Sequence, residues 1–152
     1  MLKKIILWLL VILTCVMIFN FSSKVANKSN KQSEVIVEKV EDIVTEITDK
    51  ELSNTEKEHL HNFTRKQGHF IEFLLLGIFS FLLARCYELS LKKSLLITLL
   101  FVFFYACTDE IHQIFIDGRD GNLKDVFIDF LGGVAGTAIV LPIELKKQTK
   151  KP

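Results

Sequence analysis

The 152-residue sequence is short of proline, cysteine and net charge, and each shortage argues against a class of protein. It has 2 Pro and 7 Gly against 13 Phe, a balance expected of helices that face lipid. Its 3 cysteines are odd in number and lie in or beside apolar runs, which argues against a disulfide framework or a thiolate metal site. The formal net charge of +1 indicates no strongly acidic or basic partner, so nucleic acid is not expected.

Long apolar runs are the most prominent feature of the sequence. Hydrophobic residues make up 49% of the chain, more than one small soluble core could bury. About 20 apolar residues cross a bilayer. The pattern therefore predicts an all-α, multi-pass membrane protein, in which residues 1–152 form a single bundle of about four transmembrane helices. The predicted spans are residues 5–21, 68–84, 94–116 and 123–143.

The first run could be a cleaved signal peptide, because Lys3 and Lys4 precede it. The best cleavage site follows Ala26, but Lys24 stands where a small residue is needed. We therefore expect an uncleaved signal-anchor helix.

Lysine and arginine in the short flanking segments predict the orientation. They cluster before the first span, between the second and third spans, and after the fourth. The positive-inside rule then places both termini in the cytoplasm and turns segment 22–67 and loop 117–122 outward. The basic residues in question are Lys3, Lys4, Arg85, Lys92, Lys93, Lys146, Lys147, Lys150 and Lys151.

The outward insert, residues 22–67, is not a featureless linker. Between 33 and 52 apolar residues recur at helical spacing, which predicts an amphipathic helix on the membrane or over the mouth of the bundle. Ser53 and Glu56 fit a capping box that could start another helix leading into the second span.

Polar residues inside apolar spans are costly and tend to be kept for a purpose. The expected topology brings those of three spans to one level, within roughly 10 Å of the outer interface at 1.5 Å per residue. We therefore predict a functional polar cluster there, to which the loop adds a cation. Its members are His69, Glu72, Asp109, Glu110, His112, Gln113, Arg119, Asp125 and Asp129.

Simpler interpretations of individual residues stay open. His69 and Glu72 could be a hydrogen-bonded pair at the interface with no chemistry. Gly132 and Gly136 form a small-xxx-small pair, which is more typical of close helix packing than of ligand binding.

Several chemistries fit the predicted cluster, and the sequence does not choose among them. Carboxylates and imidazoles could bind a divalent cation, but no HExxH or comparable spacing is present, so neither a metal nor a cofactor is assigned. A histidine beside a carboxylate could act as a general base on a lipid-linked substrate, although no elbow-type nucleophile is visible. Arg119 could bind an anionic headgroup, and the acids could relay protons.

Two blocks of residues resemble the VanZ-like family of small membrane proteins. Residues 65–77, with Lys66, His69, Phe70 and Glu72, are similar to the family pattern K-x-x-H-F-x-E-Y-x-x-L-G. Residues 108–136 are similar to its D-E-x-H-Q-x-F…G-R…D-x-x-x-N-x-x-G-x-x-x-G, and residues 21–23 (Phe-Ser-Ser) match a further family feature. The resemblance covers most of the chain except the 30–64 insert.

Two positions depart from the family pattern. Phe73 replaces the usual Tyr, which removes a hydroxyl, and Asp129 stands where Asn is common. A charge in place of an amide could change what the site binds, or add a metal or proton role.

The resemblance implies a bacterial cytoplasmic-membrane protein that acts in the cell envelope, linked in the founding member to lowered susceptibility to the glycopeptide teicoplanin. It implies no particular reaction, so whether the protein is an enzyme stays open. Membrane lipid is an expected partner, with a lipid-linked envelope precursor or a glycopeptide as candidates, and no oligomeric state is predicted. The alternatives are a membrane enzyme acting on a lipid headgroup or lipid-linked precursor, and a structural or partner-binding bundle.

Overall fold

The computed structural model describes residues 1–23, 26–48, 51–117, 119 and 121–149, and all regular secondary structure among them is helical. The helices are α1 (Leu2–Ser22), α2 (Ala26–Thr48), α3 (Asn54–Arg85), α4 (Leu91–Gln113) and α5 (Leu123–Thr149). The predicted all-α class is thereby confirmed. The predicted insert and the basic C-terminal tail lie partly outside the described residues, the tail at Lys150 and Lys151.

Four of the helices, α1, α3, α4 and α5, are long and apolar enough to cross a membrane. This confirms the bundle of about four transmembrane helices. Helix α4 ends at Gln113 rather than 116, because the N–H groups of Phe115 and Ile116 bond carbonyls three residues back and form tight turns. Helix α5 continues past 143 through Pro142, because hydropathy marks where an apolar run ends and not where a helix ends.

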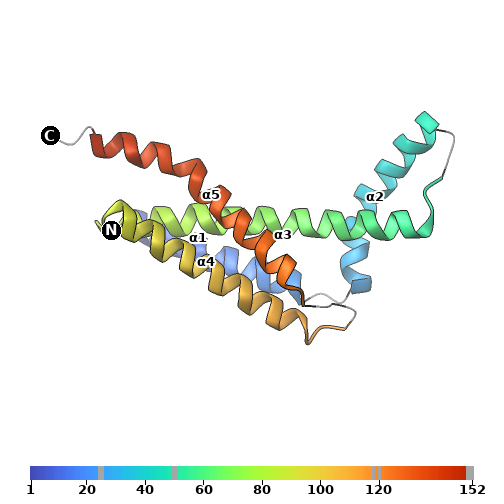
Figure 1. Ribbon diagram of the computed structural model, residues 1–152, viewed down its shortest axis with the longest axis horizontal. Helices are drawn as coiled ribbons and strands as arrows, with labels where there is room; N and C mark the ends of the chain where they lie inside the picture. The colour runs from blue at the N-terminus through green and yellow to red at the C-terminus, as the bar shows by residue number, and fades with distance from the viewer. Residues whose placement is uncertain (24–25, 49–50, 118, 120, 150–152) are drawn as a thin grey trace.

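Helix α3 is longer than a membrane span requires. Its 32 residues measure about 48 Å at 1.5 Å per residue, against about 30 Å of hydrocarbon in a bilayer. The predicted capping box starts it: the Ser53 hydroxyl accepts from the backbone N–H of Glu56, whose carboxylate accepts from the backbone N–H of Ser53 at 2.9 Å. The first half of α3 therefore extends beyond the four-helix bundle (Figure 1).

Helix α2 packs on this extension of α3 (Figure 1). Val37 is buried, and Glu41 forms an ion pair of 2.6 Å with Lys57 of α3. The amphipathic helix predicted over 33–52 is thus present but begins and ends earlier. Its apolar residues Ile36, Ile43 and Ile47 are exposed, away from the packed face.

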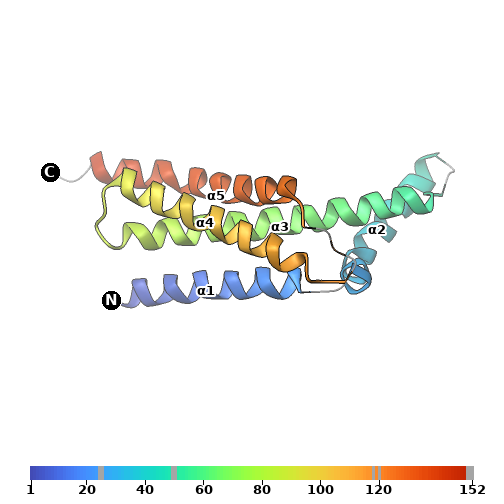
Figure 2. The same cartoon turned by 60° about the horizontal axis from the view of Figure 1, so that its bottom comes forward.

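The start of α1 and the end of α5 lie at one end of the bundle (Figure 2). We call this the terminal end. Here α3 also ends and α4 begins. The opposite end is formed where α1 and α4 end and α5 begins, beside the middle of α3, and we call it the polar end.

The closest helix packing joins α3 to α5. A Cβ atom on Gly132 would come within 2.5 Å of the Phe70 carbonyl oxygen, and one on Gly136 would overlap the carbonyl of Leu74. Both glycines therefore let the α5 backbone approach α3 directly, as small residues do between membrane helices. This contact holds the polar residues of α3 and α5 close together.

Apolar side chains fill the middle of the bundle below those polar residues. Phe73 and Leu76 of α3, Val102 and Ala106 of α4, and Ile18 of α1 are fully buried. Many other large apolar side chains face outward, as expected of helices whose outer surface contacts lipid.

Candidate functional site

A buried hydrogen-bond network joins α1 to α4 at the polar end. The Ser22 hydroxyl donates to Asp109 Oδ2 at 2.7 Å, and the Gln113 amide donates to the same oxygen at 2.9 Å. Gln113 also donates to Glu110 Oε1 at 3.3 Å. Asp109, Glu110 and Gln113 are all buried, so these bonds supply the partners that buried polar groups require.

The loop after α4 folds back over this network. Arg119 is buried and donates to Gln113 Oε1 at 3.2 Å and to the backbone carbonyl of Phe21 at 3.0 Å. The backbone N–H of Asn122 donates to Glu110 Oε2 at 2.8 Å. Burial lowers the pKa of the Arg119 guanidinium below its ordinary value, although arginine stays charged at neutral pH.

His112 faces α1 instead of the centre of the bundle. Its ring stacks on Phe19 with centroids 4.5 Å apart, and its Nε2 lies 3.0 Å from the Ser23 hydroxyl. The sequence grouped this histidine with the acids, but rotation about α4 separates it from them.

His69 brings α3 to the network from the other side. Its Nδ1 lies 3.9 Å from Glu72 Oε2 and 3.9 Å from Asp109 Oδ2, in each case longer than a hydrogen bond. His69 and Glu72 are both buried. The imidazole is therefore held among carboxylates without a hydrogen bond at Nδ1.

Helix α5 contributes two aspartates that differ in their surroundings. Asp125 is half-buried and forms an ion pair of 2.5 Å with Lys66 of α3. Asp129, one turn deeper, is 2% exposed, and its Oδ2 has no hydrogen-bond partner.

A small cavity of about 20 Å³ lies between these helices at the polar end. Its size suits one water molecule or one ion rather than a whole headgroup. The cavity has two cations, three acids, an imidazole and an amide in its lining: Arg65, Lys66, Asp125, Asp129, Glu110, His69 and Gln113, with Ile128 beside them.

The predicted residues therefore divide into groups. His69, Glu110, Gln113, Asp125 and Asp129 line the cavity, with Asp109 and Glu72 close to His69. Two others lie elsewhere at the polar end, namely His112 against α1 and Arg119 in the loop, bonded to Gln113 and the Phe21 carbonyl. The two glycines lie deeper, in the α3–α5 contact.

Four polar residues that were not predicted as site members also belong here. Ser22 and Ser23 bond Asp109 and His112, and the Phe-Ser-Ser match at 21–23 was the available signal. Arg65 and Lys66 line the cavity, and Lys66 could have been found because it lies one turn before His69 on the same face of α3.

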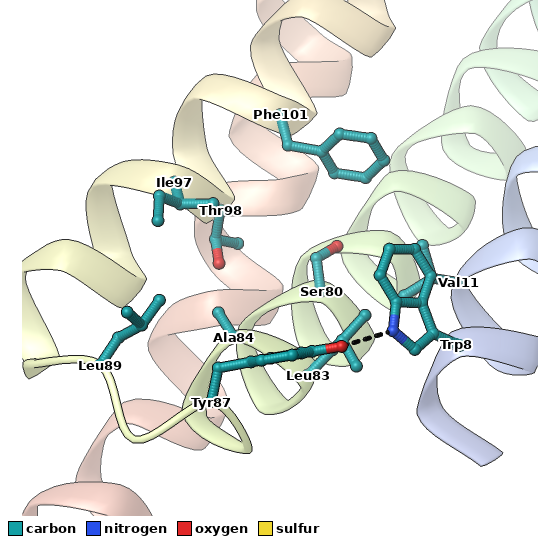
Figure 3. Close-up of a pocket in the computed structure, with 10 residues that line it drawn as sticks. All are labelled: Trp8, Val11, Ser80, Leu83, Ala84, Tyr87, Leu89, Ile97, Thr98 and Phe101. Atoms are coloured by element: carbon teal, nitrogen blue, oxygen red, sulfur yellow. Dashed lines mark hydrogen bonds between the residues drawn. The ribbon is translucent and has the colours of Figure 1, made fainter. Parts of the chain in front are cut away.

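The described residues also form cavities away from the polar end. A cleft of about 250 Å³ between α1, α3 and α4 is almost wholly apolar, and a 2.9 Å hydrogen bond from Trp8 to Tyr87 runs along it (Figure 3). At the terminal end, a cavity of about 550 Å³ is lined by Arg85, Lys147 and the buried Glu144, which both cations contact. The first is apolar, and in the second Glu144 is already paired with Arg85 and Lys147.

The fold and the site together define a small helical membrane protein with a buried polar cluster at one end. The chain matches the model of the VanZ/LLP1 family over residues 7–144, which is most of its length, and it belongs to that family. No curated protein and no solved structure matches it.

Proposed function

We propose that this VanZ-like membrane protein acts at the outer face of a bacterial cytoplasmic membrane, on an anionic, lipid-linked molecule of the cell envelope. The cavity at the polar end carries the proposal. Arg65 and Lys66 border it and could hold a phosphate or carboxylate, while His69 and the acids occupy its interior.

The distribution of charge along the bundle supports the outward orientation of the cavity. The terminal end carries Lys3, Lys4, Arg85, Lys92, Lys93, Lys146 and Lys147, because α1 and α4 begin there and α3 and α5 end there. The positive-inside rule assigns such an end to the cytoplasm. The polar end is then the outer one.

An anionic ligand would compete with Asp125 for Lys66. The ion pair between the two is only partly buried, so exchanging one carboxylate for another costs little. The cavity itself is too small for a headgroup. We therefore infer that the headgroup lies at the mouth and that only an ion, a water or one ligand atom enters.

The role of the family's founding member suggests the first test. It measures whether the protein lowers the susceptibility of cells to teicoplanin and lipoglycopeptides. Cells expressing the wild type should show a higher minimum inhibitory concentration than cells with the empty vector. Arg65→Ala and Lys66→Ala should each lower this concentration at least fourfold relative to the wild type, toward the empty-vector value. Lys92→Ala removes an exposed cation at the terminal end and is the matched control. A wild type that leaves susceptibility unchanged rejects the resistance role for this chain.

A second candidate is an enzyme that modifies a lipid headgroup or a lipid-linked precursor. The position of His69, 3.9 Å from the carboxylates of both Glu72 and Asp109, favours it, because a carboxylate can orient an imidazole as a general base. Lipid and precursor profiles of a deletion strain should then change and be restored by the wild type but not by His69→Ala. Identical profiles with and without the protein would reject an enzyme of this kind.

The third candidate, a bundle that binds a protein partner through Gly132 and Gly136, has less support. Both glycines pack against α3 of the same chain, so neither offers a free surface to a second protein.

A further inference from the structure

Three side chains from three different helices converge below the mouth of the cavity. His69 of α3, Asp109 of α4 and Asp129 of α5 each offer one ligand atom, and these atoms lie within 4.8 Å of one another. All three residues are more than nine-tenths buried, with exposed fractions of 8%, 5% and 2%. The three side chains are therefore fixed by helix packing and not by a mobile loop.

Two of these side chains have an unused polar atom. His69 Nδ1 and Asp129 Oδ2 are buried and have no hydrogen-bond partner. A buried polar atom without a partner is destabilising, and few are left in folded proteins. Both residues line the 20 Å³ cavity, which is large enough for a single small occupant.

The surrounding charge indicates that this occupant is a cation. Glu72, Asp109, Glu110 and Asp129 are all buried at the polar end. Among the described residues, Arg119 is the only buried lysine or arginine, and its guanidinium already bonds Gln113 and the Phe21 carbonyl. Arg65 and Lys66 also line the cavity but are half-buried, and Lys66 is already paired with Asp125, so the acids outnumber the cations. Carboxylates buried in a low dielectric need a counter-charge, and a divalent ion would supply one.

We propose that His69, Asp109 and Asp129 bind one divalent transition-metal ion. One imidazole with two carboxylates suits Zn²⁺ or Mn²⁺, whereas Ca²⁺ and Mg²⁺ favour sites made of oxygen alone. Bonds of about 2.0–2.2 Å hold ligand atoms roughly 3.3–3.6 Å apart in a tetrahedral site, so the side chains must close slightly. Three protein ligands leave a coordination position open toward the cavity, where a water or an anionic ligand oxygen would bind.

The bonds around Asp109 fit this role. Ser22 and Gln113 both donate to its Oδ2, which fixes the orientation of the carboxylate as outer-shell groups do at metal sites. The three ligands are separated by 40 and 20 residues along the chain. No short motif can therefore reveal the site in the sequence.

Metal binding to the purified full-length chain in lipid nanodiscs tests the proposal without any assay of function. The chain is first stripped with a chelator. Zn²⁺ is then titrated against a competing indicator dye, and Mn²⁺ is followed by electron paramagnetic resonance. The expected result is one ion per chain with a Kd in the micromolar range or below. The Mn²⁺ measurement controls for Zn²⁺ binding by the three cysteines, because thiolates favour Zn²⁺ over Mn²⁺.

Two aspartates on α5 provide a matched pair of variants. Asp129→Asn should weaken binding of both ions at least tenfold, whereas Asp125→Asn, the same change one turn earlier in the same cavity, should alter it less than threefold. His69→Ala should also lose at least tenfold. Asp129→Asn keeps the shape of the side chain, so it remains informative if the histidine variant does not fold.

Thermal unfolding provides a second measurement on the same samples. Zn²⁺ or Mn²⁺ should raise the Tm of the wild type and of Asp125→Asn but not that of Asp129→Asn. A folded wild type that binds neither ion overturns the proposal, and so does binding that both aspartate variants weaken equally or leave intact. The proposed envelope role does not require the metal, so each can fail without the other.

Discussion

The Ser22 hydroxyl donates a 2.7 Å hydrogen bond to Asp109 Oδ2, which joins the last residue of α1 to the polar end of α4. These residues are 87 positions apart in the chain, and both are buried. The bond fixes helix α1, most of whose apolar side chains are exposed on the outside of the bundle, to the part of the molecule that carries the charged groups.

Removing this hydroxyl should lower stability. We expect Ser22→Ala to reduce the free energy of unfolding by about 1–3 kcal/mol, because the buried Asp109 carboxylate loses one of its two donors to Oδ2. Thermal unfolding in detergent measures the change. Thr108→Ala removes an exposed hydroxyl from the same helix and should change the Tm little. Equal Tm values for the two variants would contradict this account.

Close approach of α3 and α5 should depend on Gly136. Gly136→Ala places a methyl group against the Leu74 carbonyl and should cost about 1–3 kcal/mol through overpacking. Gly68→Ala is the matched control, because a Cβ there meets nothing within 4 Å and alanine favours helix. Unfolding curves of the two variants should shift in opposite directions. A Gly136→Ala protein as stable as the wild type would show that the helices can separate without cost.

Arg119 should act mainly as a structural cation. Arg119→Ala leaves buried acids without its charge and should destabilise the bundle by about 3–5 kcal/mol. Arg119→Lys should restore only part of this, because one ammonium cannot reproduce the forked contact with Gln113 and the Phe21 carbonyl. The fraction of monodisperse protein after extraction, with its Tm, reports the effect. Lys124→Ala, an exposed cation just after the loop, should behave like the wild type.

Labelling of intact cells should report the orientation of the bundle. Asp117 and Lys92 are exposed and lie at the polar and terminal ends, respectively. A membrane-impermeant maleimide should label Asp117→Cys in intact cells but Lys92→Cys only after permeabilisation. The wild type measures the background from the native cysteines, all of which are half-buried. The reverse pattern would place the polar end in the cytoplasm and reject the outer-face proposal.

Much of the architecture could be predicted because it depends on local properties of the chain. The length of an apolar run determines whether a helix can cross a membrane, and this gave four spans. The capping box at Ser53 is equally local, since its groups lie three residues apart. The predicted ends of the spans were less accurate: α4 ends before residues 114–116, and α5 continues beyond Pro142. Hydropathy does not report the hydrogen bonding that defines a helix end.

The sequence by itself determined which residues would be expensive to bury in a membrane, and that these cluster near one end of the helices. Only the tertiary structure decided their grouping: His112 lies against α1, Arg119 bonds the network beneath the loop, and Asp129 converges with His69 and Asp109. The reason is geometric. Side-chain groupings across helices depend on how each helix is rotated and how closely neighbours approach, and here the glycines between α3 and α5 set that distance.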